Sequence, residues 1–209
     1  MYCYRISRCL SLVSFLFAVT ALLSCESEKQ PATFYPVDSL ISDQINYLTS
    51  IRAGLFKEAL LSGKADTTTI IPADTTGWQK ELEIFRKLDE INRPVNKEYY
   101  EVTNGQIDPT SNLRVQEVQP RKELPVKVRE QLQVAYLKIY YQRNIGKPRK
   151  IEAQYDEGNQ LFESTRFLAM HFQQIENRTV LTSYSVRGGQ KMVFGDSVAF
   201  YIGGKVLID

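Results

Sequence analysis

The residue types that most often carry out catalysis or bind metals are scarce in this chain. It has three cysteines, Cys3, Cys9 and Cys25, and one histidine, His171. A Ser-His-Asp triad or a Cys/His pair would need His171 for every role, and a zinc site built from cysteine and histidine would lack ligands. We therefore predict no catalytic residue, no metal site and no cofactor, and we interpret His171 as a structural or surface residue of a strand.

Pairs of acidic residues are the remaining route to catalysis, since glycosidases need only two well-placed carboxylates. Asp156, Glu157 and Glu163 flank the turn Gly158-Asn159 and could face one another across a hairpin. Acidic residues beside a turn are usually solvated, and no glycosidase motif surrounds these three. A non-enzymatic protein is the simpler interpretation, with a surface glycan-binding or carboxylate-based glycan-degrading protein as the alternative.

Other local motifs have structural explanations. Gly188-Gly189-Gln190 spells the tripeptide that release factors use, but two glycines between apolar segments are what a hairpin turn requires. We therefore predict turns at Gly188-Gly189 and at Gly203-Gly204. A basic cluster is interpreted as a solvated strand connection, with contact to anionic headgroups as the alternative: Arg143, Lys147, Arg149 and Lys150. The tyrosines, Tyr136 and Tyr140 among them, suit half-buried strands and also carbohydrate-binding or protein-binding faces.

The first 24 residues have the layout of a secretory signal. Arg5 and Arg8 lie near the start, and an apolar stretch follows over residues 9–23. That stretch is too short, and flanked in the wrong way, for a membrane-spanning helix of the mature protein. We therefore expect residues 1–24 to be a signal peptide that is removed on export.

The segment Leu22-Leu23-Ser24-Cys25 resembles the lipobox of bacterial lipoproteins, in which an aliphatic residue and then a small residue precede the cysteine. The resemblance implies cleavage before Cys25, a diacylglycerol on its thiol and a fatty acid such as palmitate on its freed amine. Three acyl chains, at about 0.8 kcal/mol per buried methylene, would anchor the protein stably in a membrane. The implied location is the Gram-negative cell envelope, at the outer membrane, on its periplasmic side or at the cell surface.

Cleavage before Cys25 changes two properties of the mature chain. Cys3 and Cys9 leave with the signal peptide, so Cys25 has no partner and a disulfide framework is excluded. The whole chain has 26 Lys+Arg and 24 Asp+Glu. Because Arg5 and Arg8 are lost as well, the remainder is formally neutral. A neutral chain argues against nucleic acid as a partner.

The mature chain begins with a polar segment, and we predict that residues 25–36 are a tether and residues 37–209 a single domain. Apolar residues at helical spacing predict a helix over about residues 38–52, with Asp38 as its N-cap. Residues 55–71 fit either a continuation of that helix or a β-hairpin, and their β-branched residues favour the hairpin slightly.

A second helix is predicted over about residues 77–92, where Thr76 and Gln79 have the spacing of a capping box. Its apolar stripe is expected to pack on a sheet rather than bind a ligand: Trp78, Leu82 and Phe85. Glu83 and Lys87 are predicted to form an ion pair one turn apart on its polar side.

From about residue 99 to residue 209 the apolar residues alternate with polar ones, and turn signals recur at short intervals. This pattern predicts an antiparallel meander of about six to eight strands. The predicted fold class is α+β, with N-terminal helices packed on a curved antiparallel β-sheet. Together these features predict a lipid-anchored envelope lipoprotein, attached to the membrane through Cys25. It would bind a protein partner or an apolar ligand on the sheet.

Overall fold

The computed structural model describes residues 34–159, 161–192 and 195–208, and these described residues form one compact unit. The predicted signal peptide, the lipobox and Cys25 lie outside the described residues, as does most of the predicted tether. Phe34 and Tyr35 already belong to the folded unit. Tyr35 is buried, and the ring of Phe34 meets that of Tyr100 edge-on at 6.4 Å.

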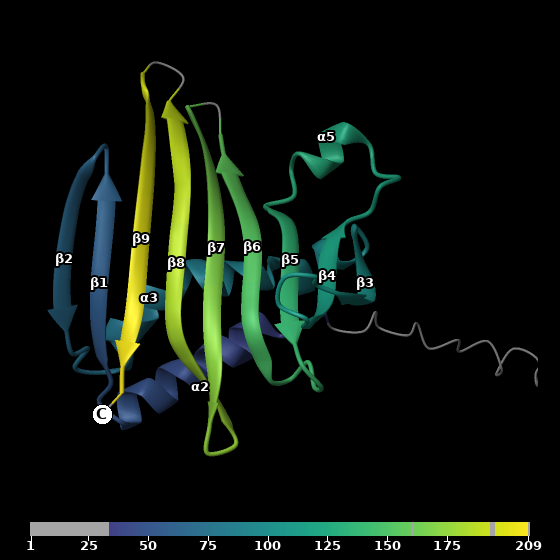
Figure 1. Ribbon diagram of the computed structural model, residues 1–209. Coiled ribbons are helices and arrows are strands. Elements are labelled where there is room, and N and C mark those ends of the chain that lie inside the picture. The colour runs from purple at the N-terminus through teal and green to yellow at the C-terminus, as the bar shows by residue number, and fades with distance from the viewer. Residues whose placement is uncertain (1–33, 160, 193–194, 209) are drawn as a thin grey trace, which may run out of the picture. The chain divides into compact units, whose positions relative to one another are not determined.

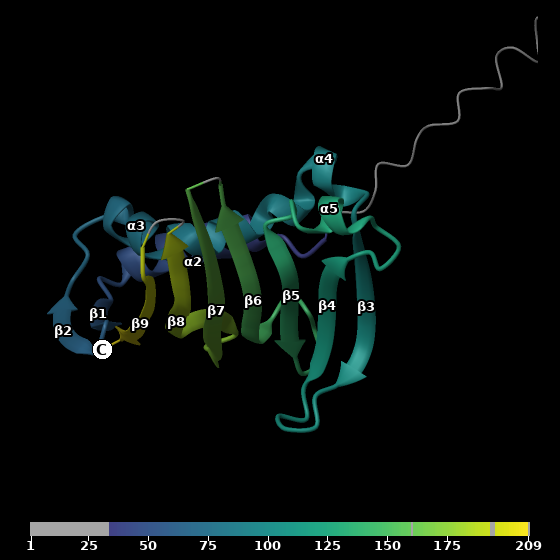
Figure 2. The ribbon, with the colours of Figure 1, turned by 90° about the horizontal axis from the view of Figure 1, so that it is seen from above.

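The described strands form one antiparallel sheet, and α2 (Val37–Ser50) and α3 (Thr75–Arg86) lie along one of its faces (Figures 1 and 2). We call this face the helix side and the opposite face, which Figure 1 shows, the open side. The strands are β1 (Gly54–Leu61), β2 (Lys64–Ile70), β3 (Tyr100–Ile107), β4 (Arg114–Pro120), β5 (Val134–Tyr141), β6 (Pro148–Gly158), β7 (Phe162–Ile175), β8 (Arg178–Met192) and β9 (Ser197–Leu207).

Their order across the sheet is β2-β1-β9-β8-β7-β6-β5-β4-β3. From β3 to β9 each strand pairs with the next in sequence, as the predicted meander requires. The hairpin over residues 54–70 is confirmed, and β1 pairs with β9 in antiparallel register. The expectation that the sheet begins near residue 99 is therefore wrong, because this hairpin extends the sheet by two strands beyond β9.

The helical elements are α2 (Val37–Ser50), α3 (Thr75–Arg86), the 3-10 helix η1 (Lys87–Asn92), α4 (Pro94–Lys97) and α5 (Val126–Arg129). The antiparallel sheet and the mixed class agree with the prediction, but the helices are not confined to the N-terminal part. The β1-β2 hairpin separates α2 from α3, and α5 lies between β4 and β5.

Both predicted helices are present, with different first residues and caps. Helix α2 follows Pro36, which makes no side-chain cap, and the predicted cap Asp38 lies inside its first turn. Helix α3 is capped by Asp74, whose carboxylate accepts a hydrogen bond from Gly77 N at 3.0 Å, so the predicted capping box at Thr76 is wrong. Asp74 rather than Thr76 is the N-cap because its extended backbone directs the side chain toward the free N–H groups of the first turn.

The core lies between the helices and the helix side of the sheet. Trp78, Leu82 and Phe85 of α3 are fully buried, which confirms the predicted apolar stripe. The ring of Phe85 meets that of Tyr184 edge-on at 5.7 Å. Full burial of three large side chains on one helix face fixes α3 on the sheet.

Two of the predicted turns are wrong. Gly188-Gly189 lies inside β8, and Gly203-Gly204 lies inside β9. A Cβ at Gly188 would collide with the carbonyl oxygen of Thr165 on β7. Glycine in a strand interior often marks such a close approach rather than a chain reversal.

Candidate functional site

Helix α3 covers only part of the helix side, and the strands continue beyond it (Figure 1). Strand register there places apolar side chains in rows. Ala59, Ile202 and Val186 are neighbours across β1, β9 and β8, and Leu61 and Phe200 are neighbours in the next row. Together with a residue of α3 they line a groove of about 690 Å³, which we call the α3 groove: Ala59, Leu61, Ile84, Val186, Phe200 and Ile202.

Some side chains in the α3 groove are open to solvent although they face the same way as core residues. Leu61 is 56% exposed and Ile202 is 37% exposed, whereas Leu55 and Val206, on the same face of the same two strands, are buried. Gly188 lies beside Phe200 and contributes no side chain to fill the space. The volume falls within the roughly 300–1,000 Å³ range of small-molecule sites.

A polar cluster closes one end of the α3 groove. The carboxylate of Glu81 accepts hydrogen bonds from Lys57 Nζ and from the Tyr184 hydroxyl, each at 2.8 Å. Burial, together with the nearby Glu81 carboxylate, raises the pKa of Tyr184, so its hydroxyl remains a donor at neutral pH. These three groups satisfy one another, which suits them to fixing the end of the groove rather than to transferring protons.

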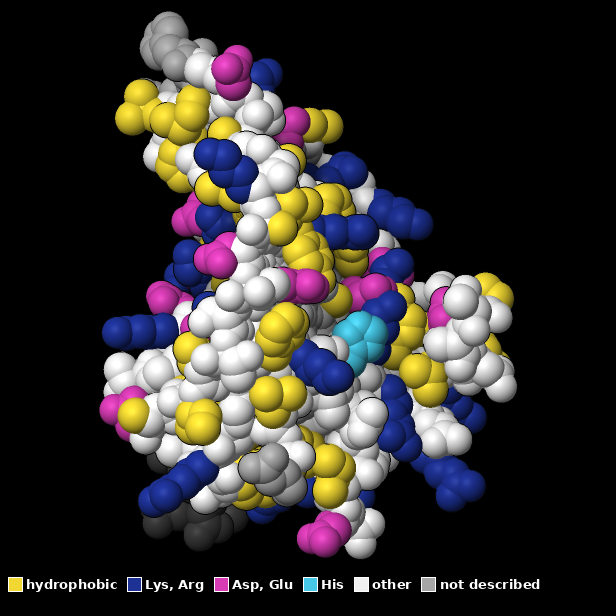
Figure 3. All heavy atoms as spheres, turned by 60° about the vertical axis from the view of Figure 1, so that its left-hand side comes forward, with side chains coloured by type: hydrophobic (Ala, Val, Ile, Leu, Met, Phe, Trp, Pro, Cys, Tyr) yellow, Lys and Arg dark blue, Asp and Glu magenta, His cyan; other side chains and the backbone are white. Residues whose placement is uncertain are grey.

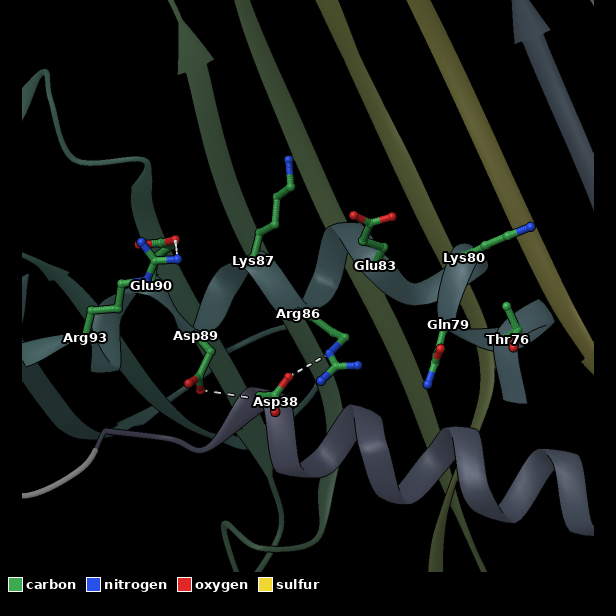
Figure 4. Close-up of a pocket in the computed structure, with 10 residues that line it drawn as sticks. All are labelled: Asp38, Thr76, Gln79, Lys80, Glu83, Arg86, Lys87, Asp89, Glu90 and Arg93. Carbon is green, nitrogen blue, oxygen red and sulfur yellow. Dashed lines mark hydrogen bonds and ion pairs between the residues drawn. The ribbon is translucent and has the colours of Figure 1, made fainter. Parts of the chain in front are cut away.

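Charged side chains of α3 and η1 form the rim of the groove. Figure 4 shows Lys80, Glu83 and Lys87 pointing away from α2, toward the uncovered part of the sheet. Lys87 Nζ lies 3.7 Å from Glu157 and 5.7 Å from the ring centre of Tyr155. The predicted Glu83–Lys87 pair is therefore wrong, because the sheet offers Lys87 a carboxylate and an aromatic face together.

Two charged side chains of opposite sign at the rim of the groove have no ion-pair partner among the described residues. Of the basic residues that line it, Lys57 pairs with Glu81, Lys87 with Glu157, and Arg166 with Glu157 at 3.1 Å. Within the described ranges, Lys80 and Glu83 both lack an ion-pair partner. Lys80 extends from the first turns of α3 at the charged rim of the groove.

A second cleft, between α2 and α3, is built almost entirely from charged residues (Figure 4). Arg86 Nε donates to Asp38 at 2.7 Å, and the backbone N–H of Asp38 donates to Asp89 at 3.4 Å. These contacts join the start of α2 to α3 and η1. Because the partners are about 40% exposed, the ion pair adds little stability, and we interpret the cleft as a junction between helices.

The predicted catalytic candidates do not come together. Asp156 lies on the open side, where it accepts a hydrogen bond from Gln154 at 2.9 Å, while Glu157 lies on the helix side and is paired with Arg166 and Lys87. Glu163 is opposite Gly158 across the β6-β7 pair. Alternation along β6 thus separates the two adjacent acids by the thickness of the sheet.

His171 and the basic cluster lie at the surface. His171 is exposed on the open side, and Figure 3 shows the histidine among basic and hydrophobic side chains. Burial of the ring and the charge of Lys150 lower its pKa, and Glu152 opposes them. Lys150 pairs with Glu152 at 2.6 Å, and Lys147 donates to the carbonyl of Asn177 at 3.5 Å, so the two lysines act separately.

Sequence reasoning missed the residues of the α3 groove. The hairpin β1-β2 was ambiguous, and Leu61 and Ile202 lie far apart in sequence. One usable signal was the run Ala59-Leu60-Leu61, which breaks the alternation expected of a strand with one solvated face. Consecutive apolar residues in a strand place apolar side chains on both faces of the sheet, so this run indicates that neither face is fully polar at the end of β1.

No family model matches the chain, and no curated protein and no solved structure is similar to it. Within the described part of the chain, no helix is both long and apolar enough to cross a membrane. Over the same residues, no group of three or more histidine, cysteine or acidic side chains could hold a metal ion. The geometry of the α3 groove is therefore the basis for a functional proposal.

Proposed function

We propose that this protein is a non-enzymatic lipoprotein of the bacterial outer membrane that binds an acyl chain in the α3 groove. The lipobox resemblance at Leu22-Leu23-Ser24-Cys25 supports attachment through Cys25. Helices α2 and α3 then act as a cover for one part of a curved sheet and leave the other part free for the ligand. The mature chain is neutral overall, in keeping with a partner other than nucleic acid.

The observation that carries this proposal is the exposure of Leu61 and Ile202 on the face that elsewhere forms the core. Each methylene transferred from water to such a surface contributes about 0.8 kcal/mol, so a long acyl chain gains more than a short one. Lys80 at the rim complements an acidic headgroup. An acyl chain with a carboxylate or phosphate at one end therefore matches both the groove and its rim.

The alternative of a glycan-degrading enzyme has less support. It needs two carboxylates that converge on one bond, and the acids expected to do so, Asp156 and Glu157, point to opposite faces. A protein partner in the α3 groove is the other alternative. It would have to present a narrow apolar segment to a groove that is bordered by charged side chains.

The proposal can be tested on the full chain in its own membrane. Cells that express it with its leader would be given a palmitate analogue that carries a photoreactive group and an alkyne, then irradiated, and crosslinked peptides would be mapped by mass spectrometry. We expect crosslinks within residues 54–61 and 197–207. The same digests test the anchor, because the first peptide should begin at Cys25 and carry the mass of its acyl groups.

A matched pair of variants makes the test specific. Ile202→Lys places a charge in the groove and should reduce crosslinking at least tenfold, whereas Leu207→Lys, at a residue of β9 with almost the same exposure (38% against 37%), should leave it unchanged. Crosslinks that are spread over the surface, or that Ile202→Lys does not reduce, would contradict acyl-chain binding. A first peptide beginning elsewhere would contradict the anchor alone.

A further inference from the structure

The open side carries its own cavity, on the opposite face from the α3 groove. Tyr201 lies along β9 so that its hydroxyl comes within 2.8 Å of the place that a Cβ of Gly203 would occupy. The same hydroxyl donates to Glu58 on β1 at 2.9 Å, and the Glu58 carboxylate also lies over Gly203. Because Gly203 has no side chain, Tyr201 can lie along the strand with its hydroxyl over Gly203, and the residue remains partly exposed to solvent.

Small and polar residues surround this ring. Strand register puts Ser185 beside Gly203, Ser183 beside Lys205, and Lys205 beside Phe56. His171 faces Ser183 across the β7-β8 pair. These residues line a cavity of about 480 Å³, which we call the Tyr201 cavity: Phe56, Glu58, His171, Ser183, Ser185, Tyr201 and Lys205.

The charges of the Tyr201 cavity balance. Glu58 and Lys205 are opposite in sign, and burial and Lys150 lower the pKa of His171, so its ring is neutral at pH 7. An anionic polymer or a cationic ligand would find no excess of the opposite charge. The balance fits a ligand that is uncharged but rich in hydrogen-bonding groups.

The position of the cavity argues against an extended peptide. Peptides that bind sheets do so at an edge strand, where backbone N–H and C=O groups are free. Strands β1, β9, β8 and β7 are all interior, with neighbours on both sides. A peptide lying across them would therefore leave its own backbone groups without partners, whereas sugar hydroxyls can bond to Ser183, Ser185 and Lys205.

We propose that the Tyr201 cavity binds a neutral oligosaccharide, with one pyranose ring stacked on Tyr201 and Phe56 at its side. Aromatic rings present a large, rigid apolar face together with a polar edge, which matches the apolar face and equatorial hydroxyls of a pyranose. Phe56 is 37% exposed and so contributes a second aromatic surface at the wall. The hydroxyl groups of the two serines and the ammonium of Lys205 supply hydrogen bonds.

The test uses the full lipidated chain in a polyoxyethylene ether detergent, because alkyl glucosides and maltosides carry sugars themselves. Cellohexaose and maltohexaose would be titrated separately by calorimetry, and a neutral hexapeptide of glycine and serine would serve as the competing class. We expect saturable binding of at least one hexasaccharide and none of the peptide. Tyr201→Ala and Phe56→Ala should each weaken that binding at least tenfold.

Two further variants separate stacking from a general loss of structure. Tyr201→Phe keeps the ring and should retain binding within about threefold. Phe167→Ala removes an aromatic residue of the same face and of the same 37% exposure, outside the cavity, and should have no effect. Failure of both sugars to bind, binding of the peptide, or equal losses in Phe167→Ala and Tyr201→Ala would each overturn the proposal.

Discussion

On each face of β9 a tyrosine lies over a glycine and donates a hydrogen bond to a glutamate, but the surroundings of the two tyrosines differ. On the helix side Tyr184 lies over Gly204 and donates to Glu81 at 2.8 Å, and on the open side Tyr201 lies over Gly203 and donates to Glu58 at 2.9 Å. Tyr184 is almost completely buried, whereas the Tyr201–Glu58 hydrogen bond is exposed to solvent. A tyrosine, a glutamate and a glycine therefore lock the core on one face and leave an aromatic surface free on the other.

The largest effects should come from two adjacent residues that face opposite ways. Ile202→Lys should reduce palmitate crosslinking at least tenfold and leave hexasaccharide binding unchanged, because Ile202 lies in the α3 groove. Tyr201→Ala should do the reverse. Both variants would be carried through both assays with Leu207→Lys as the common control, and a variant that lost both activities would show that the faces do not act independently.

A smaller effect, on stability, is expected from the two glycines. Gly204→Ala brings a methyl group against the ring of Tyr184, which Glu81 and Phe85 hold in place, and should lower the free energy of unfolding by about 1–3 kcal/mol. Gly203→Ala meets only the carboxylate of Glu58 and the hydroxyl of Tyr201. These are the far ends of side chains that can turn into solvent, so the loss should stay below about 1 kcal/mol.

Urea unfolding measures this difference, with the fluorescence of Trp78 as the probe because it is the only tryptophan. The matched control is Gly189→Ala, where the nearest atom to a new Cβ is the carbonyl oxygen of Val198 at 3.7 Å, and it should be close to neutral. Equal losses at Gly203 and Gly204 would mean that the open side is as rigid as the core.

These glycines also show where sequence reasoning stopped. Local patterns were sufficient for the buried stripe of α3 and for the meander, because each depends on residues close together in the chain. For residues 55–71 they favoured the hairpin only slightly over a continued helix. Gly188-Gly189 and Gly203-Gly204 have the same local signal as a turn, and only the strand beside them decides between a turn and a close contact. Thr165 excludes a side chain at Gly188, and Tyr184 excludes one at Gly204.

The candidate sites could not be predicted from the sequence for the same reason. The α3 groove exists because α3 runs across the strands and covers only part of their length (Figures 1 and 4). The pattern of residues within the strands does not predict where a helix will cross them. Lys87 illustrates the point, since its partner Glu157 is seventy positions away and replaces the partner expected one helical turn earlier. The sequence shows that acidic residues flank the β6-β7 turn. It does not show that strand alternation places Asp156 and Glu157 on opposite faces of the sheet.

The smallest expected effect compares the two tyrosine hydroxyls. Tyr184→Phe removes a partly buried hydrogen bond to a carboxylate and should lower the free energy of unfolding by about 1–2 kcal/mol at pH 8. Tyr201→Phe removes an exposed bond of nearly the same length, which water replaces, so its effect should lie within the error of the measurement.

The free energy of unfolding should also depend on pH through these two hydroxyls. Burial and Glu81 raise the pKa of Tyr184 in the folded protein, so the stability that its neutral hydroxyl contributes is fully present below the ordinary tyrosine pKa of about 10. Above that value the unfolded state ionises first, and the contribution is lost as pH rises. The stability difference between the wild type and Tyr184→Phe should therefore shrink between pH 8 and pH 11. Burial and Glu58 raise the pKa of Tyr201 as well, so the difference between the wild type and Tyr201→Phe should change in the same direction, but by less because this hydroxyl is exposed. A difference that grew with pH would mean that Tyr184 is not held neutral by its surroundings, and an equal change for the two tyrosines would mean that burial of Tyr184 adds nothing to the effect of its carboxylate partner.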